Sequence, residues 1–175
     1  MKNKLLIAAV LTGLLSGCVD GNSPSGSQEG VVKADPRYSE CNLPDVNERG
    51  PIAAGLYISG TLPEGYWLMK PERKMHYKGD GIYQLIYSEK AGAVTMQFAT
   101  MNWNPQFTVT GLELPLNQAK TLKKGGMDKN TKVVIPADGK YVWTIQIGPD
   151  KKAIAAMVAP CKYLFLALHY STFVE

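Results

Sequence analysis

The sequence predicts an all-β domain, or a β-rich one with one short helix, built as an antiparallel β-sandwich or small barrel of about eight short strands. Short runs in which apolar and polar residues alternate recur along the chain, and a period of two is typical of strands. The 11 prolines and 17 glycines fall mostly between these runs, where turns are expected. A composition of 45% hydrophobic and 19% charged residues is that of a globular protein.

The clearest alternation lies in residues 141–147, where Tyr, Trp and two Ile occupy one face and Val, Thr and Gln the other. The pair Asp138-Gly139 predicts a tight hairpin turn that joins this strand to another at 133–135. Residues 148–152 predict a further turn on its other side. Earlier strands are expected at 56–62, 66–69, 82–87, 94–101 and 107–114, with a hairpin turn at 88–92.

Two later segments are less regular. Residues 116–124 predict the one short helix. Residues 153–174 are apolar enough to raise the question of a membrane-spanning helix, but Pro160 near the centre, with Lys162 and His169 inside the segment, argues against one. Two strands, at about 153–158 and 162–173, explain this segment better.

The first 18 residues carry a targeting signal. Lys2 and Lys4 precede an apolar run, 5–15, that is too short to span a bilayer. The run ends in Leu15-Ser16-Gly17-Cys18, which resembles the lipobox of bacterial lipoprotein precursors. The resemblance implies that a signal peptide, 1–17, is removed and that Cys18 carries the lipid. In lipoproteins of enteric-type bacteria, an Asp directly after the lipidated cysteine tends to retain the protein at the inner membrane. Here Val19 occupies that position. The resemblance therefore implies a lipid anchor in the outer membrane of a bacterial cell envelope, facing the periplasm.

The remaining chain divides into a tether and one domain. Residues 18–40 form the lipidated N-terminus and a flexible tether, because they are polar, rich in Gly and Ser, and without a period. Residues 41–175 form a single β-rich globular domain. With Cys18 lipidated, Cys41 and Cys161 are left as a pair, and an oxidising compartment predicts a disulfide between them. Two unrelated buried thiols are the alternative.

Catalytic motifs are absent from the sequence. It contains no phosphate-binding Gly loop, no Cys-x-x-Cys, no His-Glu-x-x-His and no Gly-x-Ser-x-Gly. His76 and His169 are its two histidines, and neither lies in a catalytic pattern. We therefore expect no enzyme activity, no cofactor and no metal site. The net charge of +4 falls to +2 when Lys2 and Lys4 are removed with the leader, so nucleic acid is not an expected partner.

Two features are candidates for a binding surface. The first is a lysine cluster opposed by Asp128 alone, consisting of Lys120, Lys123, Lys124, Lys129 and Lys132. It is either a solvated loop or an electrostatic contact for anionic headgroups, lipopolysaccharide, glycan-bound phosphate or an acidic protein. The second consists of two tryptophans, Trp103 beside the turn at Asn104-Pro105 and Trp67 in the predicted strand 66–69. Each is either a core plug or a partner anchor.

The sequence thus favours a non-catalytic envelope lipoprotein that acts as a binding or assembly module in the periplasm, with an envelope protein or a cell-wall component as its partner. The alternative is an inhibitor or immunity lipoprotein that blocks a toxin or a lytic enzyme. A hydrolase with an unrecognised site is the third hypothesis.

Overall fold

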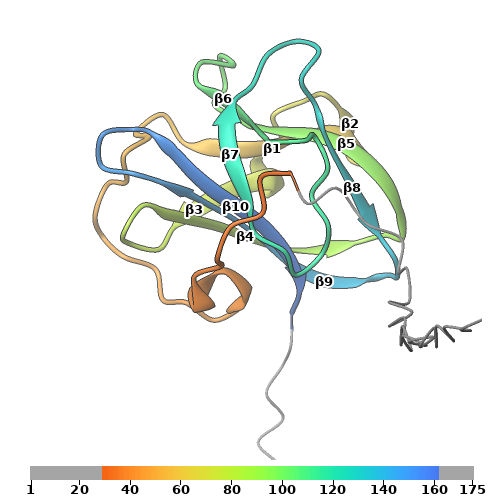
Figure 1. The fold of residues 1–175 in the computed structure, drawn as a ribbon, viewed down its shortest axis with the longest axis horizontal. Helices are drawn as coiled ribbons and strands as arrows, with labels where there is room; N and C mark the ends of the chain where they lie inside the picture. The colour runs from red at the N-terminus through yellow and green to blue at the C-terminus, as the bar shows by residue number, and fades with distance from the viewer. Residues whose placement is uncertain (1–28, 162–175) are drawn as a thin grey trace, which may run out of the picture.

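A computed structural model describes residues 29–161 and forms a closed antiparallel barrel (Figure 1). Its elements are η1 (Pro36–Ser39), β1 (Leu56–Leu62), β2 (Gly65–Tyr66), η2 (Pro71–Arg73), β3 (Lys74–Tyr77), β4 (Ile82–Glu89), β5 (Gly92–Ala99), β6 (Gln106–Val109), β7 (Lys120–Lys124), β8 (Thr131–Ile135), β9 (Gly139–Ile147) and β10 (Ala153–Pro160). The strand order is β2-β1-β3-β4-β9-β10-β7-β6-β5-β8, and a further pairing of β1 with β5 closes eight of these strands into a ring. The predicted all-β small barrel is confirmed.

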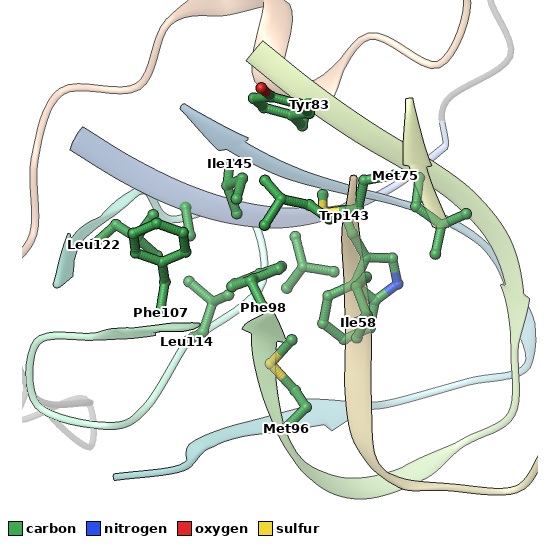
Figure 2. Packing of buried hydrophobic residues seen from close by; sticks show 14 of the residues in the cluster. Ile58, Met75, Tyr83, Met96, Phe98, Phe107, Leu114, Leu122, Trp143 and Ile145 are labelled. Atoms are coloured by element: carbon green, nitrogen blue, oxygen red, sulfur yellow. The ribbon is translucent and has the colours of Figure 1, made fainter. Parts of the chain in front are cut away.

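Strand β9 contributes side chains to both hydrophobic clusters of the domain, one cluster on each of its faces. Tyr141, Trp143, Ile145 and Ile147 point into the main core, where Figure 2 shows Trp143 and Ile145 among side chains from the opposite side of the barrel. Trp143 is directly opposite Leu85 on β4 and Val158 on β10. The alternation predicted for this strand is therefore the alternation that separates core from outer face.

Two predicted hairpins are wrong. Strand β8 pairs with β5 and not with β9, so Asp138-Gly139 does not close a hairpin. Strands β4 and β5, joined through residues 90 and 91, also belong to different ladders. The Asp138 carboxylate instead bonds Lys90 Nζ at 2.7 Å and the Ala91 N–H at 2.8 Å, which ties the two connections together. The turn between β9 and β10, predicted at 148–152, is a true hairpin.

The predicted helix at 116–124 is also wrong, because residues 120–124 form β7 between β6 and β10. Leu122 enters the main core from this strand, and Lys120 is buried on it. A strand here completes two ladders that would otherwise lose their partner, and such tertiary pairing overrides weak local propensity. The sequence also missed β3 and overestimated the lengths of the strands at 66–69 and 107–114.

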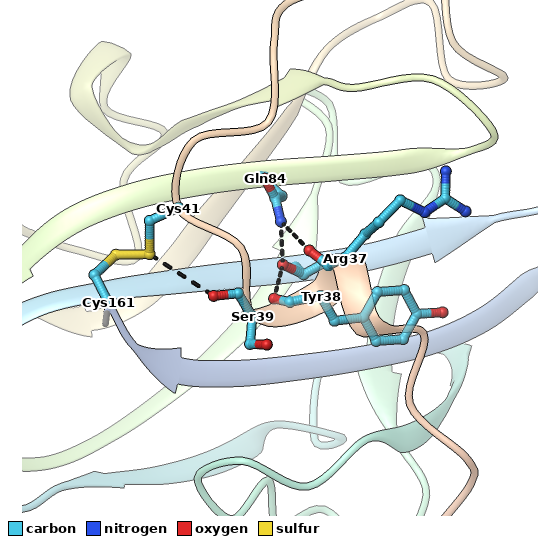
Figure 3. Close-up of a disulfide and its surroundings, with 7 residues drawn as sticks. Arg37, Tyr38, Ser39, Cys41, Gln84 and Cys161 are labelled. Atoms are coloured by element: carbon cyan, nitrogen blue, oxygen red, sulfur yellow. Dashed lines mark hydrogen bonds between the residues drawn. A yellow bond between two sulfur atoms is a disulfide. The ribbon is translucent and has the colours of Figure 1, made fainter. Parts of the chain in front are cut away.

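The segment 29–40 belongs to the domain, which corrects the predicted tether boundary. Val31 forms a β-bridge with Lys120, and Tyr38 is buried in the second cluster with Val142. Figure 3 shows η1 lying across the outer face of the sheet, where Thr144 Oγ1 donates to the Tyr38 carbonyl at 2.8 Å. The described part of the domain therefore starts before Cys41, and its N-terminal segment covers the second face of β9.

The predicted disulfide between Cys41 and Cys161 is present, with the two Cα atoms 5.7 Å apart and a sequence separation of 120 (Figure 3). It ties the segment that follows η1 to the residue that follows β10. Cys18, His169 and the predicted strand at 162–173 lie outside the described residues.

Among residues 29–161, no helix has the length and apolar character needed to cross a membrane.

Candidate functional site

Three connections lie together at one end of the barrel (Figure 1, top). Residues on or beside them line an open groove of about 570 Å³. The connections are the turn that follows β2, the turn between β5 and β6, and the loop 125–130 between β7 and β8. The groove is lined by Trp67, Gln97, Trp103, Gln106, Met127 and Asn130. Two indoles, three amides and a thioether therefore line one open hollow.

The two indoles form a platform. Trp67 and Trp103 have φ angles of 54° and 60°, a left-handed conformation that is uncommon for residues other than glycine. Backbone hydrogen bonds hold both turns, from Trp67 N–H to the Gly60 carbonyl at 2.8 Å and from Trp103 N–H to the Thr100 carbonyl at 2.9 Å. The ring centroids lie 6.2 Å apart with planes inclined at 46°. Both rings are only half-buried, so the pair keeps apolar surface open to solvent.

Gln97 connects the barrel wall to the loop 125–130. Its side chain is only 2% exposed, and its Nε2 donates to the Gly126 carbonyl at 2.8 Å and to Asn130 Oδ1 at 2.6 Å. Its Oε1 is buried without a hydrogen-bond partner. A Cβ on Gly125 would lie 2.4 Å from this oxygen, so the close approach requires glycine. One unpaired amide oxygen is thus held in the wall of the groove.

The rim of the groove is unusually apolar. Met127 is 91% exposed at the tip of its loop. Leu68 and Met101 are exposed on the turns that carry the tryptophans, and Tyr66 is exposed at the end of β2. The Tyr66 ring also packs edge-on against Trp67, with the centroids 6.3 Å apart. Exposed apolar side chains that gather at one place are typical of a binding site.

The structure divides the predicted lysine cluster. Lys120 is 0% exposed, so it is not part of any solvent-facing surface, and this part of the prediction is wrong. Lys132 lies on β8 at a different hollow, lined also by Glu113 and Val134. Lys123, Lys124 and Lys129 are exposed at the end of β7 and on the loop 125–130, beside the groove.

Sequence reasoning found the two groove tryptophans separately and missed the other four lining residues. Gln97, Gln106, Met127 and Asn130 are ordinary strand and loop residues in sequence, and no local pattern marks them. The cue that was present was Gly125, because the lack of a side chain there allows the loop to approach Gln97. Within the described range 29–161, no three His, Cys, Asp or Glu side chains are arranged to hold a metal ion.

A solved starch-binding domain is similar to this chain. No family model matches it, and no curated protein matches it. Among solved structures it is similar to the one described as "Ligand induced structure of AmyP-SBD", a starch-binding domain, with a TM-score of 0.58 and 34% sequence identity. The similarity covers 86% of this chain and 100% of that one.

That structure is of a carbohydrate-binding module without catalytic activity, so the prediction that this chain is a binding module and not an enzyme is confirmed. Since the whole of a solved domain matches at this level of identity, the chain belongs to the same family of β-rich binding domains as AmyP-SBD.

Proposed function

We propose that this chain is a carbohydrate-binding module that binds a starch-like polysaccharide in the groove that Trp67 and Trp103 line. The observation that carries the proposal is the half-buried indole pair, with centroids 6.2 Å apart, beside the buried amide of Gln97. It lies in a chain that is 34% identical to a starch-binding domain.

The chemistry of the groove suits a sugar chain. A pyranose ring has apolar C–H faces, which stack on the electron-rich face of an aromatic ring, and hydroxyls at its edge. The amides of Gln106 and Asn130 offer donors and acceptors for such hydroxyls, while the buried amide of Gln97 holds the loop 125–130 through Gly126 and Asn130. The inclination of 46° between the two indoles suits successive sugars that are rotated relative to one another, as in a curved glucan chain.

The test is binding of the full chain, purified in a polyoxyethylene detergent, to insoluble starch and to soluble maltooligosaccharides. Trp67→Ala and Trp103→Ala should each weaken binding at least tenfold, since each removes a central aromatic contact worth more than about 1.4 kcal/mol. Ile154→Ala, an exposed apolar residue on β10 outside the groove, is the matched control and should bind like the parent. Absence of binding by the parent, or full binding by both tryptophan variants, would refute the proposal.

The second part of the proposal is location. We expect the module to be held at the bacterial cell envelope by a lipid on Cys18, because a short basic region, an apolar run and the lipobox coincide in the first 18 residues. A lipid-anchored module of this kind would hold polysaccharide at the membrane surface. In cells supplied with labelled palmitate, the parent should incorporate label and Cys18→Ser should not. If the parent incorporates no label, the proposed lipid anchor is wrong, and the proposed binding in the groove is not tested by that result.

A further inference from the structure

Trp67 lies on a connection that few strand hydrogen bonds hold in place. Strand β2, which precedes it, has two residues, lies at the end of the strand order, and shifts its register with β1 between Gly60 and Thr61. Trp103 instead lies on the turn of a hairpin whose strands, β5 and β6, pair with each other. The backbone of Trp67 is also in the left-handed region, which is unfavourable for residues other than glycine. The position of Trp67 therefore depends on contacts outside its own strand ladder.

A buried arginine closes this connection. Arg73 is 1% exposed, and its Nη2 donates to Glu64 Oε1 at 2.7 Å. Glu64 comes three residues before Trp67, and Arg73 comes six residues after it. The ion pair therefore joins the two ends of the segment 64–73, which carries the indole.

Arg73 is itself fixed to the wall of the barrel. Its guanidinium donates to both carboxylate oxygens of Glu89 on β4, with Nη2 and Oε2 3.1 Å apart. Glu89 also accepts from the indole N–H of Trp143 at 2.8 Å, and the guanidinium carbon lies 3.7 Å from the centre of the Tyr87 ring. Because Glu89 pairs with Arg73 independently of Glu64, the arginine keeps a buried counter-charge when the Glu64 carboxylate is removed.

We infer that Glu64, acting through Arg73, is a positioning residue for Trp67: the ion pair holds the segment 64–73 so that the indole stays in the groove beside Trp103. The inference rests on the proposed function for its effect on binding. Glu64 is not among the residues that line the groove, so it acts on the ligand through Trp67. If the indole were correctly placed only about one fifth of the time, the apparent affinity would fall about fivefold.

The first measurement is the mobility of Trp67 without ligand, by nitrogen-15 relaxation of the full chain in detergent. The backbone amide of Trp67 should have an order parameter near the rigid value of about 0.85 in the parent and below about 0.6 in Glu64→Ala. Glu64→Asp, whose carboxylate is one methylene shorter, gives the same test if Glu64→Ala does not fold. Glu72→Ala, which removes an exposed carboxylate next to Arg73, is the matched control and should keep the parent value. A Trp67 amide that stays rigid without the Glu64 carboxylate, or is already mobile in the parent, would overturn the inference.

The second measurement is affinity for insoluble starch. Glu64→Ala should bind about fivefold more weakly than the parent. Glu64→Gln keeps an acceptor oxygen of the same reach for Arg73 and should bind within about twofold of the parent. Glu72→Ala should bind like the parent. Equal weakening by Glu64→Ala and Glu72→Ala would show a general charge effect and contradict the inference.

A double-mutant cycle separates positioning from a general loss of structure. In the Trp67→Ala background, Glu64→Ala should weaken binding no further, because the side chain through which Glu64 acts is gone. If the loss of about fivefold persists in that background, Glu64 supports the fold as a whole and is not a positioning residue for Trp67.

The two proposals fail differently. If the parent binds no starch, the proposed function is wrong, and the order parameters still decide whether Glu64 holds Trp67. If the parent binds starch and Glu64→Ala binds it equally well, the inference is wrong and the proposed function stands.

Discussion

The three tryptophans of this chain occupy two contrasting regions. Trp143 lies in the middle of β9, is 0% exposed, and donates its indole N–H to Glu89 Oε1 at 2.8 Å. Trp67 and Trp103 lie on turns with positive φ, half-buried and in contact with each other. The same side chain thus closes the core in one place and lines an open groove in the other.

The difference follows from the backbone that carries each ring. A residue at the centre of a strand paired on both sides has its side chain committed to one face of the barrel. The side chain of a turn residue in a left-handed conformation points where the turn places it. The surrounding structure must stabilise that conformation, because it is unfavourable for residues other than glycine. A change at Trp143 should therefore alter stability, and a change at Trp67 or Trp103 should alter affinity.

The largest effect is expected from Trp143→Ala. Removing a large, fully buried side chain should lower the free energy of unfolding by about 3–5 kcal/mol, because a cavity remains in the core. Urea denaturation followed by circular dichroism would measure it. Trp103→Ala, on its exposed turn, should cost less than about 1 kcal/mol in the same assay. Equal losses for the two variants would mean that the groove indoles are structural.

The next largest effect is expected at the other end of the molecule. Cys41→Ser with Cys161→Ser should lower the free energy of unfolding by about 2–5 kcal/mol, since a closed loop of 120 residues restricts the unfolded chain. Polysaccharide affinity of the protein that remains folded should not change, because the groove is lined by other connections. Mass spectrometry without reductant should find the 41–161 linkage, and two free thiols would contradict it.

A single methyl group tests the wall of the groove. Gly125→Ala places a Cβ 2.4 Å from Gln97 Oε1, so the loop 125–130 must shift. We expect the polysaccharide affinity to fall about tenfold and the free energy of unfolding to fall by about 1 kcal/mol. The neighbouring Gly126→Ala is the control, because its nearest atom outside the adjacent residues is Lys129 Cδ at 3.9 Å. Calorimetric titration of both variants separates them, and equal affinities would show that the loop position is unimportant.

The smallest expected effect concerns the network that joins the two regions. Glu89 accepts from Trp143 and from the buried Arg73, which also binds Glu64 Oε1 at 2.7 Å, three residues before Trp67. Burial opposes ionisation of Glu64, but the hydrogen bond and the charge of Arg73 outweigh it and hold the pKa of this carboxyl below its usual 4.5. The network therefore favours the ionised form of Glu64 in the folded state.

A depressed pKa stabilises the folded state above the unfolded value, and this contribution is lost as the pH falls through the folded value. Glu64→Gln should cost about 1 kcal/mol at pH 7 and less at pH 3. Glu72→Gln is the control, because it removes the charge of an exposed carboxylate in the same part of the domain. Denaturation curves at both pH values would measure the difference, and a cost independent of pH would exclude the ion pair as its source.

The sequence by itself determined the all-β class, the position of most strands, the two faces of residues 141–147 and the pairing of Cys41 with Cys161. The strand features depend on short-range periodicity, which can be read locally, and the cysteine pairing depends on the number of cysteines in the chain. The sequence also singled out Trp103, because it stands beside the turn signal Asn104-Pro105, and Trp67 as a large aromatic residue, although Trp67 was expected in a strand and lies on a turn.

The tertiary structure alone decided which strands pair and what they enclose. The Asp138-Gly139 signal describes a local turn, but closing the barrel places β8 against β5 and β9 against β4, and these pairings depend on contacts distant in sequence. Lys120 became buried because its strand fills the gap between β6 and β10. The groove unites residues 67, 97, 103, 106, 127 and 130 from separate connections and strands, and a spatial coincidence of this kind leaves no periodic trace in the chain.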